Sequence, residues 1–276
     1  MIKIVTLVEN KSCDKSCGSK HGLSFYIETK NHKILFDVGP NDLYHKNAKK
    51  LGINIEDVDM MILSHGHVDH GGGLNHFLKV NKKAKIYARL EAFHKHYTKF
   101  LFLKINIGIN CAIDNNRFVI TQKYSRIDDE IQLFSGVTGR KLFSYMNGPL
   151  MAEVDGRIQR DHFDHEQYLI LRDGKDAVLM TGCSHNGIVN IMEVFDQIAA
   201  TVQTNLLAVI GGFHLYNPVT HEYETKQRIN EIGEWLSNRQ EKYYTCHCTG
   251  KKAYSQLKEV MGEKLSYLAA GSKVEF

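Results

Sequence analysis

One short stretch constrains the fold and chemistry of this chain more than any other: SHGHVDHGGGL, residues 64–74, directly after the apolar run VDMMIL. Side chains at positions i and i+2 leave the same face of an extended segment, so His65, His67 and Asp69 can converge. The glycine turn that follows brings His70 beside Asp69. Imidazole and carboxylate groups together suit Zn²⁺, and also Fe or Mn. The stretch therefore predicts half of a pair of metal sites, with the missing ligands supplied from distant parts of the chain.

The composition is that of an ordinary globular protein, with 43% hydrophobic and 24% charged residues among 276. A net charge of +4 fits an anionic small-molecule substrate but is too small to indicate nucleic-acid binding. No apolar stretch approaches the roughly 18–20 residues of a membrane span, and the first residues lack a signal-peptide core. We therefore expect a cytoplasmic protein, without membrane attachment, whose six cysteines are reduced.

Strand-like and helix-like segments alternate through both halves of the chain, which favours an α/β fold with two sheets covered by helices. We expect one domain over residues 1–276, with an insertion or lid at about 91–150. The aromatic stretch 93–109 fits a lid, a homo-oligomer face or core. Expected strands lie at 2–8, 23–29, 32–39, 58–65, 85–90, 168–182 (a hairpin), 206–212, 242–250 and 265–276, and expected helices at 42–51, 74–81, 187–201, 224–239 and 251–262.

The motif SHGHVDHGGGL after an apolar strand resembles the H-x-H-x-D-H motif of the metallo-β-lactamase superfamily, and ILFDVG resembles the strand-ending aspartate of that family. Four further stretches resemble one branch of this superfamily and occur in its order: HGLSFYIE, TGCSHNGIVNI, VIGGFHL and CHCTG. This branch contains metal-dependent hydrolases similar to dihydropteroate-synthase-like and dihydropterin–ribofuranosylaminobenzene phosphate synthase proteins. The resemblance implies an αββα sandwich, with two mixed sheets packed face to face and helices outside. It also implies a site for two divalent metal ions, Zn first and Fe or Mn as alternatives, at the edge of the sheets.

The resemblance also implies roles for particular residues. His65 and His67 would bind the first metal, Asp69 and His70 the second, and His247 would complete the second. Asp37 would accept a proton from a ligand imidazole and so fix its tautomer.

One part of the family pattern is missing. The family usually places a metal-bridging aspartate in a TGD-like turn, whereas this turn reads TGCSH, with Cys183 at that position. We assign His185 to the first metal. Cys183 is either a thiolate ligand or a small buried thiol beneath the site. Asp164 or His165, in RDHFDHEQY, either replaces the missing ligand or lines the pocket.

His214, at the end of an expected strand, either contacts substrate and stabilises an oxyanion or is structural. The other histidines that we considered show no pattern and are expected to be surface or hydrogen-bonded residues: His32, His45, His76, His94, His96 and His221.

Two such metals would hold a hydroxide between them and polarise a carbonyl or phosphoryl oxygen, with Asp69 accepting a proton. Gly71–Gly73 would let backbone approach the metals and leave N–H groups free for an anion. The first hypothesis is therefore a hydrolase of esters or phosphoesters, with phosphate-bearing substrates favoured and Lys20, Arg140, Lys141 and Lys251 as candidate phosphate partners. The alternatives are a synthase that joins a dihydropterin to a ribofuranosylaminobenzene phosphate and releases pyrophosphate, and a sensor with a reduced metal site.

Overall fold

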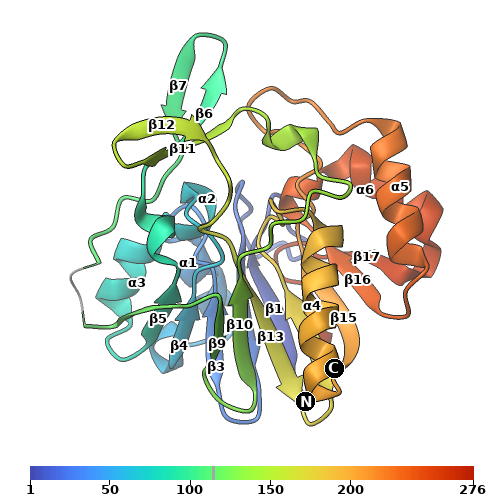
Figure 1. Cartoon of the computed structure of the whole chain (residues 1–276). Coiled ribbons are helices and arrows are strands. Elements are labelled where there is room, and N and C mark those ends of the chain that lie inside the picture. Colours follow the sequence, from blue (N-terminus) through green and yellow to red (C-terminus); the bar gives the residue numbers. More distant parts are fainter. Residues whose placement is uncertain (114–115) are drawn as a thin grey trace.

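Two seven-stranded mixed sheets pack face to face with helices on both outer sides, as Figure 1 shows for the computed structural model, which describes residues 1–113 and 116–276. This confirms the expected αββα sandwich. The first sheet has the order β18-β1-β2-β3-β4-β5-β8. Its strands are β1 (Lys3–Val8), β2 (Ser24–Glu28), β3 (Lys33–Phe36), β4 (Met60–Ile62), β5 (Lys85–Ala88), β8 (Phe118–Ile120) and β18 (Lys273–Glu275).

The second sheet has the order β17-β16-β15-β14-β13-β10-β9, and a separate four-stranded sheet has the order β12-β11-β6-β7. The strands of the second sheet are β9 (Tyr124–Arg126), β10 (Ile131–Ser135), β13 (Gln167–Asp173), β14 (Asp176–Met180), β15 (Asn205–Gly211), β16 (Lys242–Thr245) and β17 (Leu265–Tyr267). Those of the small sheet are β6 (His96–Phe100), β7 (Leu103–Asn106), β11 (Leu150–Val154) and β12 (Arg157–Arg160).

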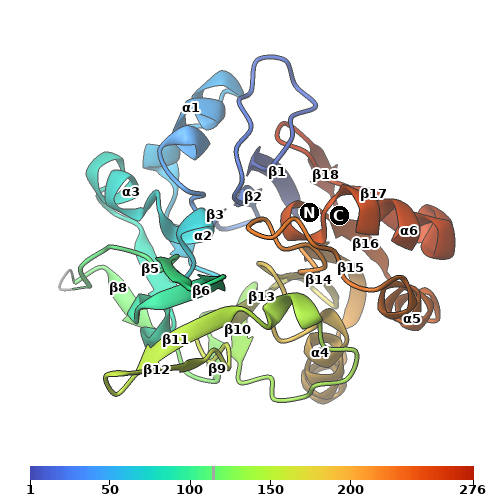
Figure 2. The ribbon, with the colours of Figure 1, turned by 90° about the horizontal axis from the view of Figure 1, so that it is seen from above.

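The helices divide between the two outer faces, as the view from above in Figure 2 shows. Apolar residues of α1 and α3 pack on the first sheet in one buried cluster, and those of α4, α5 and α6 pack on the second sheet in another. A third buried cluster fills the space between the sheets. The helices are α1 (Leu43–Lys50), α2 (Val68–Gly71), α3 (Leu74–Val80), α4 (Ile188–Val202), α5 (Lys226–Ser237) and α6 (Lys251–Met261).

The direction of the parallel strands determines where the site lies. β3, β4 and β5 run parallel in the first sheet, and β14, β15, β16 and β17 run parallel in the second. The segments after β4, β14, β15 and β16 carry His65, His185, His214 and His247 respectively. The strand ends therefore bring residues far apart in the sequence to one end of the sandwich, where α2 also lies (Figure 1).

Two segments differ from the expected elements. Residues 265–276, expected as one strand, form β17 in the second sheet and β18 in the first, because a turn with Gly271 at φ 93° separates them. The segment 91–150, expected as an insertion or lid, is divided: β8, β9 and β10 extend the two main sheets, whereas β6, β7 and β11 belong to the small sheet. Among the described residues, no helix is long and apolar enough to cross a membrane.

Candidate metal centre

Three histidines form the first group of the site. His65 and His67 lie between β4 and α2, and His185 follows β14. All three are buried, their ligand atoms lie within 4.8 Å of one another, and the Nε2 atom of each lacks a hydrogen-bond partner. A buried polar atom without a partner is costly, and three of them facing one point fit a metal ion that accepts all three lone pairs.

The other ring nitrogen of two of these histidines is held by the protein. His65 Nδ1 lies 2.8 Å from Ser64 Oγ. The Ser64 hydroxyl donates its own proton to Asp37 Oδ2, so in its contact with His65 it is the acceptor and His65 Nδ1–H is the donor. His185 Nδ1 donates to Asn147 Oδ1 over 2.9 Å. Because the proton lies on Nδ1 in both rings, Nε2 presents its lone pair, as in a metal-binding imidazole.

Asp69, His70 and His247 form a second group beside the first. His247 Nε2 lies 3.2 Å from His70 Nε2 and 3.1 Å from Asp69 Oδ2. Two metal bonds of about 2.0–2.1 Å at a tetrahedral angle separate their ligand atoms by roughly 3.3 Å, so these spacings fit a shared metal ion. Asn10 Oδ1 lies 3.0 Å from His247 Nδ1 and accepts its proton.

Asp37 follows β3 and is fully buried. Its Oδ2 accepts a hydrogen bond of 2.6 Å from His70 Nδ1, and its Oδ1 accepts the Ser64 N–H over 2.7 Å. The structure thus places Asp37 where it fixes the tautomer of His70, with Nε2 directed towards Asp69 and His247.

Cys183 lies between the two groups. Its Sγ is 3.1 Å from His70 Nε2 of the second group. It also forms one candidate ligand group with His65 and His70, and another with His185 and His214. Cys183 stands at the sequence position where the family usually has its bridging aspartate, and it lies close to candidate ligand atoms of both groups.

The electrostatics of the metal-free site differ between the groups. Burial, together with neighbouring histidines, holds the pKa values of His65 and His185 well below the ordinary value, so these rings are neutral. Burial alone would lower the pKa of His70, but the carboxylates of Asp69 and Asp37 raise it to about 9. Burial likewise opposes ionisation of Asp69, yet His70, His21 and His247 keep its pKa well below its usual range.

A cavity of about 250 Å³ opens above these groups. His214 lines it, is buried, and has no hydrogen-bond partner on either ring nitrogen. Its backbone has a φ of 46°, a strained value for a residue with a side chain. The rest of the wall is largely apolar and includes no lysine or arginine among the residues that line it: Val68, Ile107, Met146, Leu150, Pro218 and Val219 contribute.

Two residues named from the RDHFDHEQY stretch lie in different surroundings. Asp164 is exposed and lines another cavity. His165 is buried beside His67, but both of its ring nitrogens bind protein atoms, Gly66 N and Asp161 Oδ2. Neither residue supplies an unpaired ligand atom to the two groups described above.

The site also contains residues that the sequence reasoning missed. His21 Nε2 lies 3.2 Å from Asp69 Oδ2, and its ring centroid lies 4.6 Å from that of His247. Cys248 accepts the His214 N–H on its sulfur over 3.3 Å and forms a candidate ligand group with Cys183 and His247. Both residues lie within stretches that were already singled out, His21 in HGLSFYIE and Cys248 in CHCTG. His96, considered a residue without pattern, belongs to a buried histidine cluster.

The three glycines have a different function from the one expected. Their N–H groups are not free for an anion, because Gly71, Gly72 and Gly73 donate to His67 O, Val68 O and Gly39 O. Instead, a Cβ on Gly71 would lie 2.1 Å from Ile109 Cδ1, and one on Gly72 would lie 2.4 Å from Pro40 O. The glycines allow the close packing of α2 against its neighbours.

A sandwich of this type, with buried histidine, aspartate and cysteine side chains gathered at its strand ends, defines an α/β protein with a candidate metal centre. Residues 18–158 match the model of the metallo-β-lactamase superfamily. Together with two full-length relatives at 30% identity, this match shows that the chain belongs to the metallo-β-lactamase superfamily.

The relatives and solved structures cover nearly the whole chain. The chain is 30% identical over 292 residues to the 7,8-dihydropterin-6-methyl-4-(beta-D-ribofuranosyl)-aminobenzene-5'-phosphate synthase of Methanocaldococcus jannaschii, covering 100% of this chain and 97% of that protein. It is 30% identical over 262 residues, 94% of each chain, to an uncharacterized protein of the same organism. The crystal structure of a metal-dependent hydrolase of the β-lactamase superfamily matches with a TM-score of 0.79 and 27% identity, over 100% of this chain and 99% of that chain.

Proposed function

We propose that this metal-dependent enzyme of the metallo-β-lactamase superfamily is a hydrolase that uses two divalent metal ions to cleave an ester or phosphoester. The observation that carries the proposal is the pair of adjacent ligand groups. The first group is His65, His67 and His185. The second group is Asp69, His70 and His247, and Cys183 lies next to both. Two divalent cations bound there would lower the pKa of water towards about 7 and stabilise negative charge on a substrate oxygen. Imidazole, carboxylate and thiol donors together suit Zn, with Fe and Mn as alternatives.

The chain's own residues supply the remaining functions. His214 has two unpaired ring nitrogens at the cavity wall, so it can donate a hydrogen bond to a substrate oxygen on which charge develops. Asp69, which contacts His247 and His21, has a carboxylate that can accept a proton during attack. The apolar wall above them would limit the access of water to the reacting bond.

Two features bear on the substrate. The apolar wall of the cavity above the metal ligands fits an apolar or aromatic portion next to the reacting bond. Behind His185 lies a second cavity, of about 430 Å³, lined by Arg140, Arg160 and Arg228. Phe163 lines this cavity and stacks on the His185 ring at 4.8 Å. Although Asp161 also lines this cavity, we propose that its three arginines bind an anionic group distant from the reacting bond, such as a phosphate. The exposed residues Lys20, Lys141 and Lys251 line neither cavity.

The test begins with the metal content of protein purified without added metal and without air. About two equivalents of Zn, Fe or Mn per chain, and hydrolysis of model esters or phosphodiesters that is lost in His67→Ala, would support the proposal. One equivalent or fewer, unchanged by soaking with metal, would contradict a two-metal hydrolase and favour the sensor with a reduced site.

The second candidate is a synthase that joins a dihydropterin to an aryl ribose phosphate. The observation in its favour is the full-length similarity to the synthase from Methanocaldococcus jannaschii. The two reactions differ in their products. Release of pyrophosphate together with a new pterin–aryl product would establish the synthase, whereas water-dependent cleavage without such a product would establish the hydrolase.

A further inference from the structure

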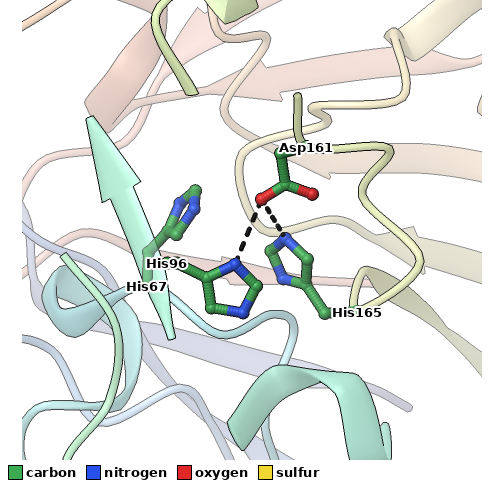
Figure 3. A group of neighbouring side chains, drawn as sticks. All are labelled: His67, His96, Asp161 and His165. Atoms are coloured by element: carbon green, nitrogen blue, oxygen red, sulfur yellow. Dashed lines mark hydrogen bonds and ion pairs between the residues drawn. The ribbon is translucent and has the colours of Figure 1, made fainter. Parts of the chain in front are cut away.

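Four buried side chains form a cluster beside the first metal position: His67, His96, Asp161 and His165 (Figure 3). They come from three parts of the chain, since His67 precedes α2, His96 begins β6, and Asp161 and His165 follow β12. Their candidate ligand atoms lie within 4.8 Å of one another. Either these residues bind a further metal ion or they hold one another in place.

The hydrogen bonds of His165 distinguish these two roles. The Gly66 N–H donates to His165 Nδ1 over 2.9 Å, so Nδ1 presents its lone pair and the proton of the neutral ring lies on Nε2. His165 Nε2 donates this proton to Asp161 Oδ2 over 3.2 Å. A metal ion on Nε2 would require both nitrogens to be unprotonated, which a neutral imidazole cannot provide. The contacts therefore fit a hydrogen-bonded chain and do not fit a metal ligand.

Asp161 is itself held firmly. Its Oδ1 accepts the Phe163 N–H over 2.7 Å, and its Oδ2 lies 3.1 Å from His96 Nδ1 as well as near His165, as the dashed lines in Figure 3 show. The Asp161 side chain is only 2% exposed. Because an ionised carboxylate accepts hydrogen bonds and donates none, Asp161 determines which nitrogen of His165 carries the proton.

The end of this chain of contacts is the peptide between two metal ligands. Gly66 separates His65 from His67, and a Cβ on Gly66 would lie 2.3 Å from Ala92 O. The Gly66 residue therefore packs closely against the Ala92 backbone, and its N–H is hydrogen-bonded to His165. Its orientation sets the directions in which His65 and His67 leave the backbone.

We propose that Asp161 and His165 are positioning residues for the first metal ion: Asp161 fixes the tautomer of His165, and His165 holds the Gly66 amide so that His65 and His67 converge. This inference rests on the proposed metal centre. It also explains why the small sheet is tied to the site, because β6 carries His96 in the cluster and Thr98 in the cavity wall.

The sharpest test is Asp161→Asn, which keeps the size of the side chain. In one orientation the asparagine NH₂ faces His165 Nε2, so the proton of the His165 ring moves to Nδ1, where it opposes the Gly66 N–H. In the other orientation the asparagine NH₂ faces the Phe163 N–H, so two hydrogen-bond donors oppose each other there. We expect Co²⁺ to bind at the His65–His67–His185 position about 10- to 100-fold more weakly, with a changed ligand-field spectrum. The matched control is His162→Asn, at the exposed neighbouring position, which should bind Co²⁺ with the wild-type affinity and spectrum.

A second pair of variants keeps the inference testable if Asp161→Asn does not fold. His165→Asn places an amide oxygen near the Nδ1 position and should preserve most of the Co²⁺ affinity and the spectrum, whereas His165→Leu should lose both. Wild-type affinity and spectrum in Asp161→Asn or His165→Leu would overturn the inference. A third metal equivalent present in the wild type and absent from Asp161→Asn would overturn it as well, since the cluster would then be a metal site. Failure of the wild-type chain to bind Co²⁺ would instead contradict the proposed function.

Discussion

The Asp37 carboxylate and the His70 imidazole form a fully buried hydrogen bond of 2.6 Å between the segment that follows β3 and α2. In Asp37→Asn the amide would face His70 Nδ1–H with its own N–H, or else face the Ser64 N–H. We expect metal affinity at the Asp69–His70–His247 position to fall about 10- to 100-fold, as measured by competition with a chelator. Asp129→Asn, at a carboxylate that is 92% exposed, is the control. Unchanged affinity in Asp37→Asn would mean that His70 does not bind metal through Nε2.

The contact between Cys183 and His70 predicts a thiolate ligand. In the Co²⁺-loaded protein we expect a thiolate-to-cobalt charge-transfer band in the near ultraviolet, because Cys183 Sγ lies against ligand atoms of both positions. Cys183→Ser should remove the band and weaken binding of the second equivalent. Cys13→Ser, at an exposed cysteine, is the control. If the band survives in Cys183→Ser and disappears in Cys248→Ser, the ligand is Cys248 instead.

The raised pKa of His70 predicts how the metal-free protein responds to pH. A histidine whose pKa rises from about 6.5 in the unfolded chain to about 9 in the folded protein stabilises the fold fully below pH 6.5. This stabilisation, on the order of 3 kcal/mol at most, is lost as the pH rises through 9. Urea unfolding of metal-free protein should therefore show falling stability between these pH values.

His70→Gln in the metal-free form is the control for this prediction and should flatten the decrease. Metal-loaded protein should also lack it, because the metal replaces the proton on Nε2. A wild-type metal-free protein that is equally stable at pH 6.5 and pH 9 would contradict the raised pKa.

The cavity lined by arginines predicts a selective effect on substrate binding. Replacing Arg160 by Gln removes a positive charge from the cavity behind His185. It leaves unchanged the residues that line the other cavity, above the candidate metal ligands. We expect a rise in KM of about tenfold for a substrate with a remote phosphate, from the loss of one charge-assisted hydrogen bond worth roughly 1.5 kcal/mol. KM for an uncharged ester should not change, and Arg157→Gln, at an exposed position of the same strand, should affect neither. Equal effects on both substrates would show that the cavity does not bind the anionic group.

The close packing of α2 predicts that Gly72→Ala is destabilising although φ at this position is −63°. The added Cβ would lie 2.4 Å from Pro40 O and 2.5 Å from Val68 O, and backbone atoms cannot move away cheaply. We expect a loss of about 1–3 kcal/mol in the free energy of unfolding. Gly148→Ala, where the Cβ would meet only Tyr145 O at 3.2 Å, should cost much less. A Gly72→Ala variant as stable as the wild type would show that α2 is free to shift.

Local sequence determined most of the helices and strands, and it brought together the candidate metal ligands of residues 65–70. The hairpin at 168–182 and the helices near 187–201 and 251–262 follow from hydrophobic period and turn residues, which act over a few positions, and the structure contains them. His65, His67, Asp69 and His70 lie together because they are neighbours in the chain. In the second half, His247 was identified from the resemblance to a family, and His185 was chosen because it follows the end of the expected hairpin, since nothing in the spacing of distant residues shows that they meet.

Tertiary structure decided what depends on pairing between distant strands. Periodicity cannot tell which sheet a short apolar strand joins, so residues 265–276 were expected as one strand although they end in two sheets. His21, Cys248 and Asp161 lie inside stretches that the sequence analysis singled out, but nothing in the local pattern shows which distant residues they contact. His165 meets Gly66 across 99 positions of sequence, and a hydrogen bond between residues so far apart is fixed only when the sheets have packed. The sequence specifies which groups can bind metal, whereas the packed sheets decide which nitrogens are left unpaired to do so.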